Sequence, residues 1–586
     1  MQTIDSNNDK DNKQSSSTGR RLTNRNKNKM LMEEHESGSL SSTPPFKLPF
    51  GGTTTPSSVY GADTIGSSSP PFRLQHGSVQ YISANSVVKM VGKEETGGHG
   101  HPVSRGKLIV GALVALLLPA VLYVIASRQL GAALSYPFSL IIIPSFILLA
   151  PFIYFSYRVK GSRPFVKSRG VTILMTGAFC YYSLIVPIYI ACLMAIFFHR
   201  ETDFVTYVRN EYYTGASWLV AIPIAYAHGC VFTQFALLSK TSLRSKWYLR
   251  LVSWPSSIFF TTLILALPLL LVLPFLPAIV CTLLALIPLI LSCIGLYQTL
   301  RTLPPNQWVV KDILVRSSTE EDDSLINKKR VHRVNCEPPK EHEIVDFRQP
   351  LTVVQIADPH LGPIMSIERL EEICESTVKL NPDLVILTGD FFTAEAFLPG
   401  DSLERALRPL KKLAGKTFAC LGNHDYEEGC LEMLESALKS IECYLLVDEC
   451  VLFESRIGKV QIVGFDYRAK NRQEHIQKVC EAYPPIPHVP RIGLLHDPGA
   501  FKFIPVDYGM IAFSGHTHGG QIGLNCLGIN ASIVGFAIPD HGLWQNGGNY
   551  LYVHTGQGCR SLMGTMVLRV GVPTEDSLLQ VFFENN

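Results

Sequence analysis

Cysteine is spread through this sequence without the spacing that metal sites or redox centres need. None of the 14 cysteines forms a CxxC pair; five lie in apolar stretches and nine lie beyond Trp308. The pattern argues against a thiolate zinc site. It indicates small core residues in a reducing compartment, and a disulfide remains an open alternative.

Charge and early apolar runs are also scarce. Charged residues make up 17% of the 586, and the formal net charge is only +3, so no nucleic acid partner is expected. No apolar run precedes Leu108, which argues against a signal peptide. Residues 1–104, rich in Ser, Thr, Asn, Gly and Pro, are predicted to be a disordered low-complexity tail. We assign no function to the basic cluster between Arg20 and Lys29.

Long hydrophobic runs are the feature that the sequence does have. The hydrophobic fraction is 47%, and several runs in residues 105–301 each approach the roughly 20 residues that a helix needs to cross a bilayer. We predict a multi-pass α-helical transmembrane domain of about six helices. The runs are Leu108–Ala126, Pro137–Tyr157, Val171–Phe198, Trp218–Leu238, Ser256–Leu273 and Ala278–Leu296.

Basic residues decide the predicted orientation of these helices. Lys and Arg gather before the first run, after the second and after the fourth, whereas the alternate loops carry only Arg128, Arg200 and Arg209. Short cytoplasmic loops collect Lys and Arg, so six helices would place both termini and the C-terminal part in the cytosol. Five helices would reverse this arrangement.

The six runs contain no Asp, Glu, Lys or Arg, and only His228 as an ionisable group. Transport pathways usually leave ionisable residues at membrane depth, so an anchor or a platform for a lipid substrate is favoured over a transporter. Prolines within the runs leave room for kinks that line a cavity, and the transporter alternative therefore stays open.

The chain after the membrane section reads as an α/β domain. Residues 302–348 are predicted to be a linker with leading strands at Trp308–Val315 and Val331–Val334, and residues 349–586 the catalytic domain. In this domain five short apolar runs each end on side chains that bind metals, and ligands bind outside the carboxyl ends of strands in α/β sheets. The side chains that follow the runs are Asp358 and His360; Asp390; Asn423, His424 and Asp425; His496; His516 and His518.

These side chains share one donor chemistry. Imidazole nitrogens with carboxylate or amide oxygens, and no thiolate, favour Mn, Zn or Fe. Side chains two apart in an extended segment share a face, so His516 and His518 can address one cavity. Each piece alone is common in proteins, but all five in order predict a site for divalent metal ions.

The five blocks resemble those of the calcineurin-like metallophosphoesterases. The matching residues are Asp358-Pro-His360, Gly389-Asp390, Gly422-Asn423-His424-Asp425, His496 and Gly515-His516-Thr517-His518. Gly519, Gly520 and Gln521 extend the last block as in the membrane-associated, YkuE-like branch that includes lipid A pathway hydrolases. The resemblance covers about residues 349–570, with Trp308 as an alternative start, and implies a four-layer sandwich of two mixed β-sheets flanked by helices.

The resemblance also implies roles for these residues around two divalent metal ions. Asp358, His360 and His518 would bind one ion, Asn423, His496 and His516 the other, and Asp390 would bridge them. His424 would act as general acid or transition-state donor, oriented by Asp425. Thr393 stands where many relatives carry an acidic residue, which leaves the partner of His424 open, and Pro359 should only stiffen its turn.

We therefore expect an integral multi-pass membrane protein whose cytosolic domain hydrolyses a phosphoester or pyrophosphate bond of a small-molecule or lipid-linked substrate. The alternative is a transporter or scaffold with a regulatory phosphoesterase-like domain that does not turn over. The sequence indicates neither substrate-binding residues nor the oligomeric state. Arg468, Lys470 and Arg472 either contact the substrate or belong to a solvated loop. The segment Asp540–Arg560 forms either a rim of the substrate site or ordinary turns. Asn530 would be a glycosylation acceptor only if the domain were lumenal.

Overall fold

The structure is a computed structural model of the 586-residue chain. It describes residues 77–84, 245–270, 278–300, 308–316, 331–362, 364–392, 400–426, 430–559 and 568–585, and single residues or short stretches within 223–234 and 561–566. The first three apolar runs, and the tail apart from 77–84, lie outside the described residues.

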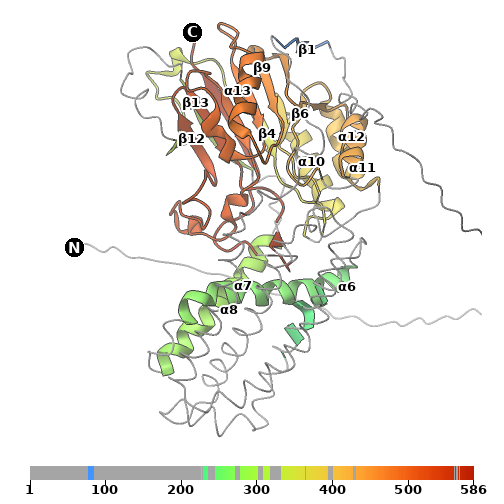
Figure 1. The fold of residues 1–586 in the computed structure, drawn as a ribbon, viewed down its shortest axis with the longest axis vertical. Coiled ribbons are helices and arrows are strands. Elements are labelled where there is room, and N and C mark those ends of the chain that lie inside the picture. The colour runs from blue at the N-terminus through green and yellow to red at the C-terminus, as the bar shows by residue number, and fades with distance from the viewer. Residues whose placement is uncertain are drawn as a thin grey trace, which may run out of the picture. The chain divides into compact units, whose positions relative to one another are not determined.

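Two mixed β-sheets form the hydrolase part of the chain (Figure 1). The six-stranded sheet has the order β2 (Val309–Val315), β16 (Ser577–Phe583), β4 (Leu351–Ile356), β5 (Leu384–Leu387), β6 (Thr417–Ala419), β7 (Tyr444–Leu445). The eight-stranded sheet has the order β1 (Val79–Ile82), β8 (Glu449–Ser455), β9 (Gly458–Phe465), β10 (Arg491–Leu495), β11 (Ile511–Ser514), β13 (Asn549–Val553), β12 (Gly542–Asn546), β3 (His332–Val334). Strands β4 to β7 run parallel, as do β9, β10, β11 and β13.

Alternation along the strands builds separate cores on the two faces of each sheet. In β5, Leu384 and Ile386 enter the core between the sheets, whereas Val385 and Leu387 face the core under the helices. This is the two-residue period of a strand that is buried on both faces.

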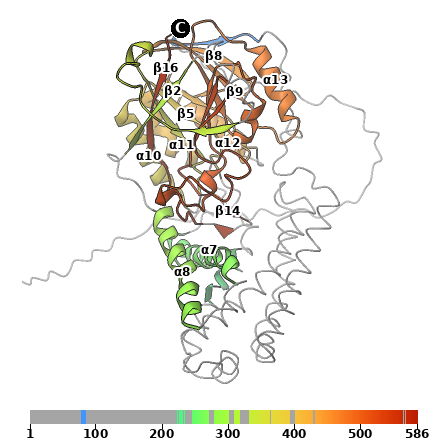
Figure 2. The same cartoon turned by 90° about the vertical axis from the view of Figure 1, so that its left-hand side faces the viewer.

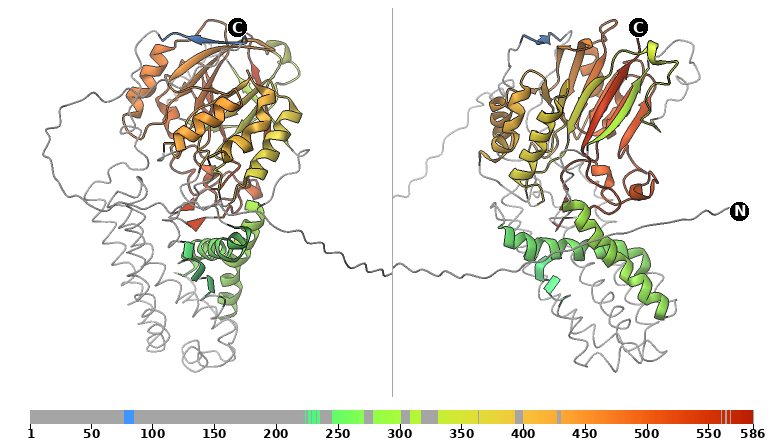
Figure 3. Two further views of the ribbon diagram at one scale, coloured as in Figure 1. Left: turned by 90° about the vertical axis from the view of Figure 1, so that its right-hand side faces the viewer. Right: turned by 180° about the vertical axis from the view of Figure 1, so that it is seen from behind.

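Helices cover the outer faces of the sheets. The helices α10 (Ile367–Leu380), α11 (Ser402–Leu407) and α12 (Cys430–Ser440) pack on the six-stranded sheet, and α13 (Arg472–Ala482) packs on the eight-stranded sheet (Figure 3). The resulting order of layers is helix, sheet, sheet, helix. The predicted pair of mixed sheets flanked by helices is thus confirmed.

The structure departs from the predicted tail and agrees with the predicted leading strands. Val79–Ile82, assigned to the disordered tail, forms β1 and pairs antiparallel with β8, with Val79 and Tyr81 packed against the core between the sheets. Strands β2 and β3 are the leading strands expected within residues 302–348, and they belong to the two sheets, so the hydrolase part includes residues from Trp308 onward. Long-range strand pairing, which local composition does not report, places β1 in the sheet.

Apolar helices lie in the stretch before the hydrolase part. The fifth and sixth apolar runs form α7 (Trp254–Leu270) and α8 (Ala278–Leu300). By length and composition, one helical stretch among the described residues, Lys246–Ala266, suffices to cross a membrane, and Leu286–Leu300 is a shorter apolar helix. This stretch joins α6 (Lys246–Tyr248), the π-helical η3 (Leu249–Ser253) and α7, so residues expected in a basic loop are helical. The multi-pass arrangement remains a prediction.

The last turn of α8 is hydrogen-bonded to the hydrolase part through residues 568–571. Thr299 Oγ1 accepts the backbone N–H of Arg569 at 2.9 Å, and Gln298 Oε1 accepts that of Gly571 at 3.0 Å. Thr261 Oγ1, on α7, accepts the N–H of Leu568 at 3.1 Å. The short strands β14 (Ser561–Leu562) and β15 (Thr565–Met566) lie beside α7 (Figure 2).

Candidate metal centre

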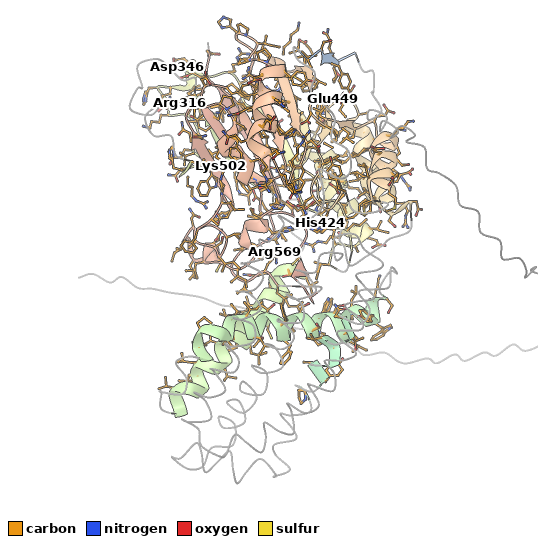
Figure 4. The ribbon with its side chains drawn as sticks, viewed as in Figure 1. Arg316, Asp346, His424, Glu449, Lys502 and Arg569 are labelled. Carbon is orange, nitrogen blue, oxygen red and sulfur yellow. The ribbon has the colours of Figure 1, made fainter. Side chains whose placement is uncertain are left out.

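The predicted site residues follow the carboxyl ends of parallel strands from both sheets. Asp358 and His360 follow β4, Asp390 follows β5, Asn423 follows β6, His496 follows β10, and His516 and His518 follow β11. In Figure 4 the nearby His424 and Arg569 lie at one end of the hydrolase part, and Arg316 and Asp346 lie at the other. The structure brings the seven residues together at the end of the sheets where α/β proteins bind ligands.

Asp358, His360 and His518 form the first group of donor atoms. Each is buried, and their donor atoms lie within 4.8 Å of one another. The Nε2 atoms of His360 and His518 are 3.0 Å apart, and His518 Nε2 is 3.9 Å from Oδ1 of Asp358. Three donors at this spacing can hold one cation.

His496, His516 and Asn423 form the second group. His496 Nε2 lies 3.2 Å from Nδ1 of His516 and 3.2 Å from Oδ1 of Asn423. An amide oxygen and two imidazole nitrogens suit the same borderline divalent ions as the first group. The donor set of both groups therefore fits Mn, Zn or Fe.

Asp390 lies between the two groups. Its Oδ2 is 3.3 Å from Nε2 of His496 in one group and 3.7 Å from Nε2 of His360 in the other. One carboxylate within reach of both groups is the geometry of a shared ligand, as two-metal sites require.

Backbone carbonyls fix which ring nitrogen faces the cavity. His360 Nδ1 lies 3.0 Å from the carbonyl of Phe392, and His496 Nδ1 lies 2.7 Å from that of Thr388. Each Nδ1–H donates to its carbonyl, which directs Nε2 into the site, where it would bind a cation once it has lost its proton.

The ligand loops adopt backbone conformations that ordinary residues avoid. Positive φ angles occur at 48° for Asp358, 55° for Asp390 and 70° for His516, and also at His360 and His518. Such residues persist where surrounding structure overdetermines them, and they cluster at functional sites. Glycine is required at position 515, because a Cβ there would overlap Oδ2 of Asp358.

The buried charges of the site compensate one another. Burial opposes protonation of His496, but Asp390 outweighs it and raises the pKa of His496 to about 10. Burial alone would raise the pKa of Asp390, and His496, His424 and His360 instead hold it well below its usual range. Burial raises the pKa of Asp358 to about 7. Imidazole nitrogens must be unprotonated to bind a cation, so metal binding at this site should release protons.

His424 and Asp425 follow the Asn423 ligand position, and they differ in their surroundings. The rings of His424 and His360 are 5.1 Å apart, and the His424 backbone N–H donates to Oδ1 of Asp390. The Asp425 carboxylate accepts the backbone N–H groups of Asp390, Phe391 and Gly422 at 2.8 to 2.9 Å. Asp425 thus joins the two ligand loops, and an orienting contact with the His424 ring stays a prediction. Thr393 lies outside the described residues.

Arg569 is a site residue that the sequence did not reveal. Its fully buried guanidinium donates to the carbonyls of His518, Thr555, Gly556 and Gly558 at 2.6 to 3.2 Å. Burial lowers the pKa of Arg569 to about 10. The only available signal was one charge inside the apolar run from Met566 to Val572. This arginine fixes the loop behind a metal-ligand position.

The three basic residues Arg468, Lys470 and Arg472 have different surroundings in the structure. Arg468 forms an ion pair with Asp448 at 3.3 Å, so it is held within the fold. Lys470 and Arg472 line a groove of about 850 Å³ together with Lys502. Arg472 also forms an ion pair at 2.6 Å with Asp497, the residue after His496.

The two histidines of the segment Asp540–Arg560 also have different surroundings. His541 lies 2.7 Å from the amide nitrogen of Asn525, and His554 is fully buried, with Nδ1 accepting the Gly556 N–H at 2.9 Å. His554 is thus a structural residue, while Arg560 lies outside the described residues.

Comparison with known families agrees with this geometry. Residues 351–520 match the model of the calcineurin-like phosphoesterase family, and the chain carries a calcineurin-like metallophosphoesterase domain. The predicted resemblance is confirmed. The match contains all five blocks and leaves the apolar helices outside it.

Several bacterial proteins are similar to the hydrolase part. An uncharacterized metallophosphoesterase, YkoQ of Bacillus subtilis, is 33% identical over 182 residues, 30% of this chain and 63% of the relative. The UDP-2,3-diacylglucosamine pyrophosphatase LpxG of Chlamydia muridarum is 28% identical over 219 residues, 30% of this chain and 65% of the relative. YkuE of Bacillus subtilis is 25% identical over 213 residues, 36% of this chain and 73% of the relative. The chain spans 60 to 63% of the length of the first three relatives it matches.

Proposed function

We propose that this chain is an integral, multi-pass membrane protein whose cytosolic domain hydrolyses a phosphoester or pyrophosphate bond with two divalent metal ions. The observation that carries the proposal is the position of Asp390, whose Oδ2 lies within 3.7 Å of donors from both groups. A carboxylate within reach of both groups would be the shared ligand of two cations, and the remaining donors of each group would complete its site.

The ligand assignment follows from the two groups. Asp358, His360 and His518 would hold one cation, and Asn423, His496 and His516 the other. Cations held by these residues would supply charge neutralisation at the phosphoryl oxygens and an activated water. His424, which borders the first group, would donate a proton to the leaving oxygen.

Two observations support a lipid-linked substrate. The apolar helix α8 is hydrogen-bonded to residue 569, whose side chain binds the loop of His518. The similar protein LpxG is by name a pyrophosphatase of a diacylated sugar nucleotide. A metal centre connected in this way to an apolar helix could reach the phosphate group of a lipid in a membrane.

The test is hydrolysis by the purified full-length protein of a panel of phosphodiesters, monoesters and lipid pyrophosphates, with and without added Mn. Asp390→Asn should lose activity by more than about a hundredfold, because loss of mere supporting partners already costs 10- to 100-fold. Asp401→Asn is the matched control, since Asp401 is exposed and makes no side-chain cap hydrogen bond. Cleavage restricted to soluble nucleotides would remove the lipid element.

Metal content and sidedness complete the test. Protein that binds no divalent ion and is inert with and without Mn would contradict the enzymatic proposal and leave the transporter or scaffold alternative. Glycosylation at Asn530, or protection of the domain from protease in sealed vesicles, would contradict the cytosolic orientation.

A further inference from the structure

The segment that follows the last metal-ligand position is unusually apolar and exposed. Residues 519–539, which we call the apolar loop, contain no Asp, Glu, Lys, Arg or His. Phe536 is 92% exposed, Leu527 68% and Ile533 65%, and Leu524 and Ile529 are also exposed. Soluble surfaces scatter such side chains singly, and their concentration in one loop marks an interaction surface.

The base of the apolar loop is fixed by polar contacts. Thr517 Oγ1 donates to the carbonyl of Asp540 at 2.6 Å, and Ser532 Oγ donates to its Oδ2 at 2.6 Å. The backbone N–H of Gly523 donates to the carbonyl of Val570 at 3.0 Å. These hydrogen bonds hold the backbone of the apolar loop against the hydrolase part.

The apolar loop lies beside the last turn of α8. The carbonyl of Gly571 accepts the N–H of Cys526 at 2.9 Å, while the N–H of Gly571 donates to Gln298 on α8. One residue thus connects the loop and the helix end. The two apolar elements occupy the same side of the hydrolase part.

The exposed surface of α8 indicates what surrounds this side. Leu283 is 64% exposed, Ile290 54% and Tyr297 67%, and α8 contains no charged residue. Exposed aliphatic side chains suit lipid hydrocarbon, and a tyrosine near a helix end suits the membrane interface. The last turn of α8 then marks the bilayer surface, and the apolar loop lies at that level.

We infer that the apolar loop inserts its exposed side chains into the interface of a lipid bilayer. Because the loop carries no charge, the contact depends on apolar insertion and not on anionic headgroups. The inference rests on the proposed membrane location and deepens the proposed function: the loop begins directly after His518, so insertion places the metal centre at the level of the lipid phosphates.

The test uses full-length protein reconstituted in phosphatidylcholine vesicles with or without brominated acyl chains, which quench nearby tryptophan. Phe536→Trp reports on the apolar loop. Val345→Trp is the matched control, because Val345 is 81% exposed and lies beside Asp346 at the opposite end of the hydrolase part (Figure 4). Subtracting the parent protein removes the signal of the five native tryptophans.

Bromine should quench more than half of the fluorescence that Phe536→Trp adds and leave that of Val345→Trp unchanged. Equal quenching of the two variants would overturn the inference. Blue-shifted emission at position 536 without quenching would also overturn it, since a second copy or another protein would then cover the loop. Asp390→Asn should not alter the quenching, so loss of catalysis and loss of membrane contact are distinguished.

Discussion

Arg569 Nη1 donates to the backbone carbonyl of His518 at 3.2 Å, and Nη2 of the same guanidinium lies 3.4 Å from the His518 ring nitrogen Nδ1. His518 also lies in the first group of donors, so the arginine acts on the metal centre through a ligand position. Arg569 is therefore a positioning residue.

Arg569→Lys should reduce kcat/KM and metal affinity by roughly 10- to 100-fold, the usual effect of removing a partner that orients a ligand. An ammonium cannot match the fork with which the guanidinium reaches four carbonyls. Kinetics and metal titration measure the change. Arg348→Lys is the control, because Arg348 also donates to a histidine carbonyl, that of His488, on the exposed surface. Weaker folding with unchanged metal affinity would show that Arg569 is structural only.

Thr299→Val, a substitution on α8, should lower both the stability and the activity of the hydrolase part. The substitution keeps the shape of the side chain but leaves the buried N–H of Arg569 without its acceptor, which costs about 1 to 3 kcal/mol. Thermal unfolding and activity of the full-length protein should both decline. Ser292→Ala removes a buried α8 hydroxyl that bonds only within the helix, to the carbonyl of Pro288, and should leave activity unchanged. Equal effects of the two substitutions would exclude coupling through this contact.

Chelation should abolish activity, and Mn, Zn or Fe should restore it. A cation present at about 100 times its dissociation constant stabilises the native state by about 2.7 kcal/mol, so the unfolding midpoint should rise with added metal. Asp390→Asn should lose most of this rise, whereas Asp401→Asn should retain it. Differential scanning fluorimetry with elemental analysis measures both quantities, and a midpoint unaffected by metal in the parent protein would contradict the assignment.

His554 should make stability depend on pH. Burial lowers its pKa from 6.5 to about 4, so the folded protein holds a neutral ring and the unfolded chain binds the proton first. The contribution is fully present above pH 6.5 and is lost as pH falls toward 4, by roughly 3 kcal/mol in total. His554→Gln removes the titration, so the stability advantage of the parent over this variant should shrink from pH 7.5 to pH 5. Parallel pH profiles in denaturant unfolding would contradict the prediction.

The sequence predicted the parts of the site that adjoin strands. Asp358, Asp390 and His496 each follow a short apolar run, and parallel strands bring such run ends together regardless of their distance in the chain. Local composition and spacing were therefore sufficient to predict these positions.

Contacts that depend on tertiary packing could not be predicted. Arg569 reaches a carbonyl at position 518 through a loop closure that leaves no periodic trace, and β1 lies in a segment whose composition is that of a flexible tail. The positive φ of Asp358 and His360 is likewise imposed by surrounding structure, since neither residue type demands it. These features depend on which distant segments meet.

Strand β16 has a consequence for the order in which the protein matures. It lies between β2 and β4 in the six-stranded sheet, pairing with both, although it comes from residues 577–583. Strands β2 and β4 leave the ribosome long before β16, so the sheet stays unfinished, with open strand edges, until residues 577–583 have been made. Truncation before Ser577 would leave β2 without its neighbour and expose the nascent domain to aggregation and proteolysis.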